Sequence, residues 1–165
     1  MGINVLFIYP NTYGMNMLPP AIALFSALLK REGHRVELFD ATYYQTGHGI
    51  DSDGTKAEFL NVVPFNMEDR GIKLRFSDWR EDLRAQVRRF SPDLIAISST
   101  EDMWELGLFL LEAIESDIAR AGIPVIAGGV FPTFAPDLAL EHRLIDMVCV
   151  GEGEHALLDL SLIHI

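Results

Sequence analysis

The chain has 165 residues, of which 49% are apolar and 22% charged, so its size and composition are those of one soluble globular domain. A net charge of −11 disfavours nucleic acids and anionic membrane surfaces as partners, and we expect neither. The single cysteine, Cys149, excludes an internal disulfide and cannot by itself hold a metal ion or an iron–sulfur cluster.

The N-terminal stretch lacks the order of a secretory signal peptide, which is a basic region, an apolar core and a small-residue cleavage site. The longest mostly apolar stretch, residues 18–29, is too short to span a bilayer. We therefore expect a cytoplasmic protein.

The first part of the chain predicts a strand, a helix and a second strand. Residues 4–9 form a continuous apolar run, which is typical of a strand buried on both faces. Apolar residues then recur at helical spacing over 18–29, and Gly33 ends that helix. Residues 35–39 predict the second strand, and His34 just before it is expected at the surface.

Residues 41–76 contain several glycines and no sustained period, so we expect an irregular insert there. A loop of this length is usually functional or mobile. Residues 78–90 then predict an amphipathic helix, with Asp78 as its N-cap and Glu81 at the capping-box position.

The second half alternates strands with helices. We expect Trp104 and Phe109 to lie in the core, and Cys149 to be a buried strand residue. The predicted strands are 94–98, 123–127 and 145–150, and the predicted helices are 101–121, 133–140 and a segment from Glu154 onward.

This order of elements predicts an α/β fold: a doubly wound, flavodoxin-like parallel five-stranded sheet with strand order 2-1-3-4-5 and helices on both faces. Its switch point lies between the first and third strands, so the loops after these strands flank the expected ligand crevice. The candidate contacts in these two loops are Pro10, Asn11, Gly14, Ser98, Ser99, Thr100 and Glu101.

Two glycine turns follow the fourth and fifth strands on the same side of the sheet. Without side chains, a ligand could approach the backbone there, and free N–H groups at the helix start after Gly129 suit an oxygen-rich or phosphate-bearing ligand. A tight turn that needs positive φ, or simple helix capping by the glutamates, explains these turns equally well. The candidate contacts are Gly128, Gly129, Val130, Phe131, Pro132, Gly151, Glu152 and Gly153.

The hydroxyl groups of residues 98–100 are either ligand contacts or an ST-turn that caps the next helix. Glu101 and Asp102 form a carboxylate pair, but acidic residues are common in the first turn of a helix. We assign no catalytic residue and no metal-ligating residue.

Several motifs of other nucleotide-binding and catalytic folds do not occur. The chain has no G-x-x-x-x-G-K-[ST] loop, no G-x-G-x-x-G after the first strand and no G-x-S-x-G elbow. Asn11 and the residues 98–100 stand where a phospho-receiver domain would need acidic residues.

Taken in order, the motifs resemble the N-terminal cobalamin (B12)-binding domain of B12-dependent radical S-adenosylmethionine (SAM) enzymes, over residues 3 to about 159. The stretches that carry the resemblance are 5–10 (VLFIYP), 19–20 (PP), 32–36 (EGHRV), 93–98 (DLIAIS), 128–133 (GGVFPT) and 146–154 (DMVCVGEGE).

The resemblance implies a Rossmann-like cobalamin-binding domain over residues 1–159 that holds cobalamin at the carboxyl ends of the strands. The nucleotide tail would lie near the ends of the third and fourth strands. Residues 98–100 match the small polar turn of the family, Gly128 and Gly129 its glycine pair, and residues 151–153 its last loop. The chain lacks the D-x-H-x-x-G motif whose histidine ligates cobalt in B12 mutases, so the resemblance implies base-off, His-off binding.

Radical SAM chemistry needs three cysteines in C-x-x-x-C-x-x-C, and this chain has one. The [4Fe–4S] cluster and SAM are therefore expected in a following C-terminal radical SAM domain, joined in cis, and the chain alone is expected to bind rather than to catalyse. Residues 160–165 resemble translated sequencing adapter, so we interpret them as a non-native tail of a truncated fragment.

Two other functions remain open. The same fold could belong to a flavin- or nucleotide-binding flavodoxin-like protein. Alternatively, it could be a degenerate docking domain without cofactor, in which Tyr13, Met15 or Phe131 blocks the crevice.

Overall fold

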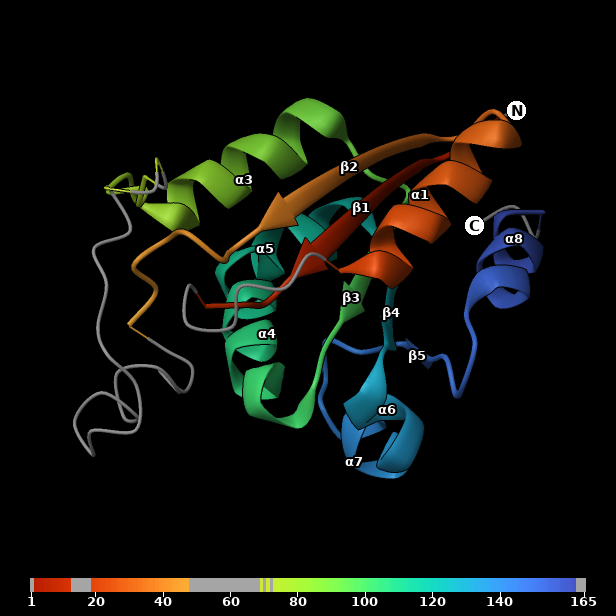
Figure 1. The fold of residues 1–165 in the computed structure, drawn as a ribbon. Helices are drawn as coiled ribbons and strands as arrows, with labels where there is room; N and C mark the ends of the chain where they lie inside the picture. The colour runs from red at the N-terminus through yellow and green to blue at the C-terminus, as the bar shows by residue number, and fades with distance from the viewer. Residues whose placement is uncertain (1, 13–18, 48–68, 70, 72, 163–165) are drawn as a thin grey trace.

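The computed structural model describes residues 2–12, 19–47, 69, 71 and 73–162. Five parallel strands form one sheet in the order β2-β1-β3-β4-β5, as predicted (Figure 1). The strands are β1 (Asn4–Tyr9), β2 (Arg35–Asp40), β3 (Leu94–Ser98), β4 (Val125–Gly128) and β5 (Met147–Val148).

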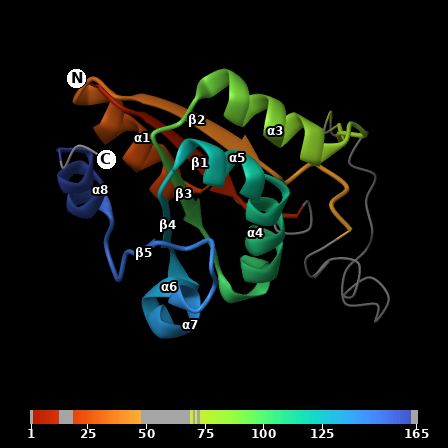
Figure 2. The same cartoon turned by 180° about the vertical axis from the view of Figure 1, so that it is seen from behind.

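Helices cover both faces of the sheet, as a doubly wound fold requires (Figures 1 and 2). The α1–α8 face carries α1 (Pro20–Arg31) and α8 (Glu154–Leu162). The α3–α5 face carries α3 (Trp79–Phe90), α4 (Glu101–Ala113) and α5 (Glu115–Ala121). Two short helices, α6 (Val130–Phe134) and α7 (Pro136–Leu140), lie beyond the end of β4.

The central strands are apolar on both sides because both of their faces are covered. Leu6 and Ile95 point into the core of the α3–α5 face, whereas Phe7 and Ala96, one residue further along, point into the core of the α1–α8 face. Strand pairing fixes this alternation, with Leu6 opposite Ile95 in the register of β1 and β3.

The helix predicted over 101–121 is broken in two at Ile114, which has φ −113°. Arg84 on α3 donates from Nε to the carbonyl of Ala113 at 2.8 Å, so a side chain of another helix takes up a carbonyl at the break. The helix predicted over 133–140 is likewise replaced by two short helices, with Ala135 outside helical geometry between them (φ −134°, ψ 55°) and Pro136 starting the second.

The fifth strand is much shorter than the predicted 145–150. The carboxylate of Asp146 accepts a hydrogen bond from the backbone N–H of Val125 at 2.8 Å, so a side chain occupies the ladder position before β5. Cys149 therefore lies after the strand and is half-buried, which corrects its assignment as a buried strand residue.

His34 is buried rather than at the surface, because its Nδ1 accepts a hydrogen bond from the N–H of Ile3 at 3.1 Å. The predicted N-cap of α3 is confirmed, since the carboxylate of Asp78 accepts from the N–H of Arg80 at 2.9 Å. Glu81 instead pairs with Arg84.

The two ends of the predicted insert over 41–76 lie close together. Tyr44 and Arg75 form a parallel bridge, and the Tyr44 hydroxyl donates to the carboxylate of Asp82 at 2.9 Å. Arg75 donates to the same hydroxyl at 3.0 Å. Burial, the largest cause, raises the pKa of Tyr44.

No helix within the described ranges is long and apolar enough to cross a membrane.

Candidate functional site

The carboxyl ends of the strands meet along one side of the sheet, here called the carboxyl edge. Ser98 at the end of β3 lies opposite Gly128 at the end of β4, so the predicted turns after these strands are neighbours. The last loop, residues 149–153, joins them on the β5 side, where Cys149 donates from its N–H to the carbonyl of Ala127 at 2.8 Å.

The β1 side of the carboxyl edge is closed by internal hydrogen bonds. Asn11 is buried, and its Nδ2 donates to the hydroxyl of Thr42 at 3.0 Å. Thr42 in turn donates to the carboxylate of Asp40 at the end of β2. The amide of Asn11, predicted as a ligand contact, therefore ties the ends of the first two strands together. Pro10 beside it is also buried.

Thr12 lies one residue further along the same loop. Its Oγ1 is buried and has no hydrogen-bond partner among the described residues, so it is an orphaned polar atom at the predicted switch point. Gly14, another predicted contact in this loop, lies outside the described residues, as do Tyr13 and Met15.

The turn after β3 is held mainly through its backbone. Ser99 is buried, its N–H donates to the carbonyl of Gly128 at 3.0 Å, and its hydroxyl donates to the carbonyl of Thr100 at 2.8 Å. Thr100 is the N-cap of α4, but its hydroxyl makes no capping hydrogen bond to the helix. Glu101 is exposed in the first turn of α4.

The two glycines after β4 have different structural roles. Gly129 has φ +98°, and a Cβ there would lie 2.6 Å from the carbonyl oxygen of Ser99. Packing against the β3 turn therefore requires glycine at this position. Gly128 has ordinary strand geometry, and a Cβ there would meet nothing closer than the Cβ of Cys149 at 3.8 Å.

The start of α6 does not offer all the free N–H groups that the sequence suggests. Phe131 donates from its N–H to the carbonyl of Ser99 at 3.2 Å, so this donor is already used. The ring of Phe131 packs against Trp104, with centroids 4.7 Å apart, and does not line the slot described below. Val130 is exposed and Pro132 is buried.

The last loop contacts the glycine pair through Thr133, a residue absent from the predicted contacts. Its hydroxyl donates to the carbonyl of Gly129 at 2.8 Å and accepts from the N–H of Gly151 at 3.1 Å. Gly151 has φ +85° and faces open space, and Glu152 beside it is exposed. A Cβ at Gly153 would lie 2.9 Å from the ring of Phe25, so this end of the loop packs on α1.

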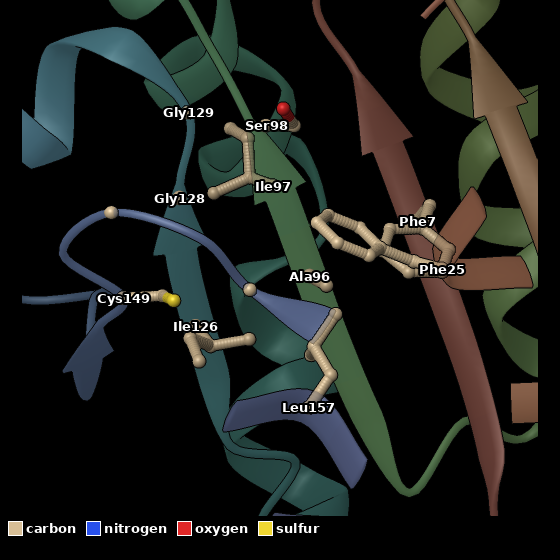
Figure 3. Close-up of a pocket in the computed structure, with 12 residues that line it drawn as sticks. Phe7, Phe25, Ala96, Ile97, Ser98, Ile126, Gly128, Gly129, Cys149 and Leu157 are labelled. Atoms are coloured by element: carbon tan, nitrogen blue, oxygen red, sulfur yellow. The ribbon is translucent and has the colours of Figure 1, made fainter. Parts of the chain in front are cut away.

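These turns surround a narrow slot that opens between β3, β4 and the last loop (Figure 3). In Figure 3, Phe7 and Phe25 lie on one side, with Cys149 and Ile126 on the other. The slot encloses about 40 Å³, room for a few water molecules. It is lined by Phe7, Phe25, Ala96, Ile97, Ser98, Ile126, Gly128, Gly129, Cys149, Gly151, Gly153 and Leu157.

The slot is mainly apolar, with glycine backbone at its mouth. Burial, and secondarily the carboxylate of Glu154, raises the pKa of the Cys149 thiol above its ordinary value of 9.0, so the thiol is neutral at pH 7. Among the described residues no three His, Cys, Asp or Glu side chains group closely enough to hold a metal ion. The lining therefore suits an apolar group of a ligand, with contacts to the backbone at the rim.

A family model of the B12 binding domain matches residues 58–161, more than half of the chain. The chain therefore belongs to the B12-binding domain family, which confirms the family resemblance of its motifs. No match is found among curated proteins.

Solved structures with this fold are found in larger enzymes. The radical SAM methyltransferase TsrM from Kitasatospora setae, with tryptophan substrate and a SAM analog bound, matches with a TM-score of 0.65 and 20% identity, covering 99% of this chain and 26% of that one. TsrM with cobalamin and a [4Fe–4S] cluster matches at 0.64 and 21%, covering 98% and 26%.

The cobalamin-dependent SAM radical enzyme OxsB, with aqua-cobalamin and SAM bound, matches with a TM-score of 0.61 and 21% identity, covering 98% of this chain and 18% of that one. At these identities the likeness establishes the shared fold. The chain thus spans about a quarter of the length of TsrM and about a fifth of OxsB.

Proposed function

We propose that this chain binds cobalamin at the carboxyl edge and is the cofactor module of a B12-dependent radical SAM enzyme of the methyltransferase type. The observation that carries the proposal is the slot, a glycine-rimmed apolar opening at the carboxyl edge of a chain that belongs to the B12-binding domain family. Open α/β sheets bind ligands at this edge.

The residues at the edge fit such a cofactor. Gly128 leaves the mouth of the slot open, because even an added Cβ would meet only Cys149, at 3.8 Å. Ala96 and Ile126 give the slot an apolar floor for the nucleotide base of the tail. The hydroxyl of Ser98 offers a hydrogen bond to a polar group at the rim, and the orphaned Oγ1 of Thr12 offers another on the β1 side of the carboxyl edge.

The slot must widen to admit a ring, since it encloses about 40 Å³ and ligand pockets usually hold several hundred. Phe25 on α1 and Leu157 on α8 line it, and rotation of these two side chains would separate its walls. Bound cobalamin would supply a cobalt centre able to carry a methyl group. The chain's own part is to hold the cofactor, through the predicted contacts that line the slot, and to keep water from its buried tail; these contacts are Ser98, Gly128, Gly129, Gly151 and Gly153.

We further propose that cobalamin binds base-off and without a histidine ligand. The three described histidines, His34, His142 and His155, do not line the slot. His34 instead accepts a backbone hydrogen bond near the start of β1.

The wider context belongs to the same proposal. The [4Fe–4S] cluster and SAM would be held by a radical SAM domain in cis, by analogy with TsrM, which binds a [4Fe–4S] cluster, and OxsB, which binds SAM. We also propose that the protein is cytoplasmic. We propose that its domain covers residues 1–159 and that residues 160–165 are of non-native origin, although α8 continues to Leu162.

A titration of the purified chain with hydroxocobalamin, followed by desalting and visible absorption, tests the proposal. We expect retained cobalamin with a base-off spectrum. The variant Gly128→Val keeps a residue suited to strand geometry but projects methyl groups into the slot, so it should retain much less. Ala85→Val, on the exposed side of α3, is the matched control and should bind like the wild type.

A folded wild-type chain that retains no cobalamin would overturn the proposal. Retention of flavin instead would favour the flavodoxin-like alternative. The degenerate docking domain is expected to have its crevice blocked by Tyr13, Met15 or Phe131. Of these, only Phe131 is among the described residues, and its ring packs against Trp104. A base-on or histidine-ligated spectrum would overturn the base-off, His-off mode alone.

A further inference from the structure

Thr133 occupies a distinctive place behind the slot. Its hydroxyl bonds to Gly129, four residues before it, and to Gly151, 18 residues after it, and so lies between two segments of the carboxyl edge. It donates to the carbonyl of Gly129 at 2.8 Å and accepts from the N–H of Gly151 at 3.1 Å. One hydroxyl therefore uses both its donor and an acceptor lone pair to join the glycine pair to the last loop.

A threonine in a helix often donates to the carbonyl four residues earlier, so the bond to Gly129 alone would be ordinary. The backbone N–H of Thr133 already donates to that carbonyl at 3.2 Å, and the α6 turn does not depend on the side chain. The bond from Gly151 is different, because it is long-range and ties down a residue exposed in a loop.

The last loop has few other anchors among the described residues. Its first residue is fixed by the bond from Cys149 N–H to Ala127, and its end by the packing of Gly153 on Phe25 and by the bond from Leu157 N–H to the Gly153 carbonyl. Between these ends, Val150, Gly151 and Glu152 are exposed, and the carbonyl of Glu152 accepts a long hydrogen bond from the Cys149 thiol of the same loop at 3.9 Å. The bond to Thr133 fixes the middle of the loop, and with it the side of the slot that Gly151 lines.

We infer that Thr133 is a positioning residue for the cofactor: its hydroxyl holds the last loop at a set distance from the glycine pair, and so sets the width of the slot mouth. The inference rests on the proposed function. Thr133 itself does not line the slot, so it acts through Gly129 and Gly151.

Thr133→Val tests this inference, because valine has nearly the same shape but no hydroxyl. We expect the dissociation constant for hydroxocobalamin to rise about fivefold, the effect of losing one ordinary hydrogen bond. Thr133→Ser keeps the hydroxyl and should restore binding. Ser116→Ala, which removes an exposed hydroxyl from α5, is the control and should bind like the wild type.

A second readout follows the loop itself. Hydrogen exchange at the Gly151 amide, measured without ligand, should be faster in Thr133→Val and normal in Thr133→Ser. The Tm of each variant establishes that it is folded; if Thr133→Val unfolds, Thr133→Ala is measured in its place.

The outcomes separate the two proposals. If the wild type binds and Thr133→Val binds equally well, or if Gly151 exchange is unchanged, the positioning role is wrong and the proposed function stands. If the serine variant fails to restore binding, the hydroxyl is not the operative group and the inference is overturned. A wild type that binds no hydroxocobalamin overturns both.

Discussion

The two faces of the sheet are covered unequally. Among the described residues, 24 buried apolar residues form the core of the α3–α5 face, but only eight form the core of the α1–α8 face. The slot opens on the α1–α8 face, through Phe7, Ala96 and Ile126. The α3–α5 face therefore contributes most of the buried core, whereas the α1–α8 face leaves room for a ligand.

The largest expected effect compares one leucine from each face. Leu110→Ala, from the α3–α5 face, removes a side chain with no exposed surface and should cost about 3 kcal/mol of unfolding free energy. Leu157→Ala, beside the slot, should cost about 2 kcal/mol because the cavity it leaves can open to solvent. Urea denaturation measures both, and an equal or larger loss for Leu157→Ala would break the comparison.

The glycine pair gives the next effect. Gly129→Ala places a Cβ 2.6 Å from a backbone oxygen at positive φ and should cost at least about 2 kcal/mol. Gly128→Ala, its matched control, meets only ordinary contact and should change stability by less than about 1 kcal/mol. Thermal and urea unfolding check the ranking; equal losses would mean that Gly129 is not required by the β3 turn.

A smaller effect is expected on acidification, which should remove part of the stability that Asp82 gives to the α3–α5 face. Hydrogen bonds from Ser77, the larger cause, and from Tyr44 hold the pKa of Asp82 on α3 below its ordinary value of 3.8. A carboxyl whose folded pKa is lowered stabilises the fold above its unfolded pKa, and this stabilisation disappears as pH falls through the folded value.

We therefore expect Asp82→Asn to be less stable than the wild type by about 1 kcal/mol or less at pH 7, with the difference shrinking below pH 4. Urea unfolding at pH 7 and pH 3 measures it. Asp137→Asn, an exposed acid on α7, is the control. A difference that grows on acidification would contradict the assigned hydrogen bonds.

The smallest effect probes the α1–α8 face chemically. Because burial raises the pKa of Cys149, little thiolate is present at pH 8, and iodoacetamide should alkylate the folded chain several-fold more slowly than the urea-unfolded chain. Hydroxocobalamin should slow the reaction further, since Cys149 lines the slot. Mass spectrometry follows this single-cysteine reaction, and equal rates would show that the slot is open to reagents.

Much of the fold follows from local patterns. Three of the longer strands, β1, β3 and β4, are mainly apolar runs followed by small residues or turns, and the connection rules for parallel sheets then give the order 2-1-3-4-5. The break at Ala135 had a local signal in Pro136, but the break at Ile114 and the shortness of β5 could not be predicted in the same way. The break at Ile114 coincides with a bond from Arg84 on another helix, and the short β5 with the Asp146 side chain, both of which are tertiary contacts.

The candidate site divides similarly. The neighbouring positions of residues 98–99, 128–129 and 151–153 follow from topology alone. The difference between Gly128 and Gly129, and the internal partner of Asn11, depend on packing across turns. Thr133 had a signal, a hydroxyl four residues after Gly129, but its bond to Gly151 needs a three-dimensional structure.

The lateral ends of the sheet bear on how the protein behaves at high concentration. Exposed strands can recruit strands from other copies and start aggregation, and nature counters this with short strands and charge. Here β5 offers only two residues, while β2 carries Arg35, Glu37 and Asp40. Arg89 and Gln86 hold the carboxylate of Glu37 beside β2, at 2.6 and 2.8 Å. Neither border is a long apolar template, so the sheet resists growth by strand addition from its neighbours.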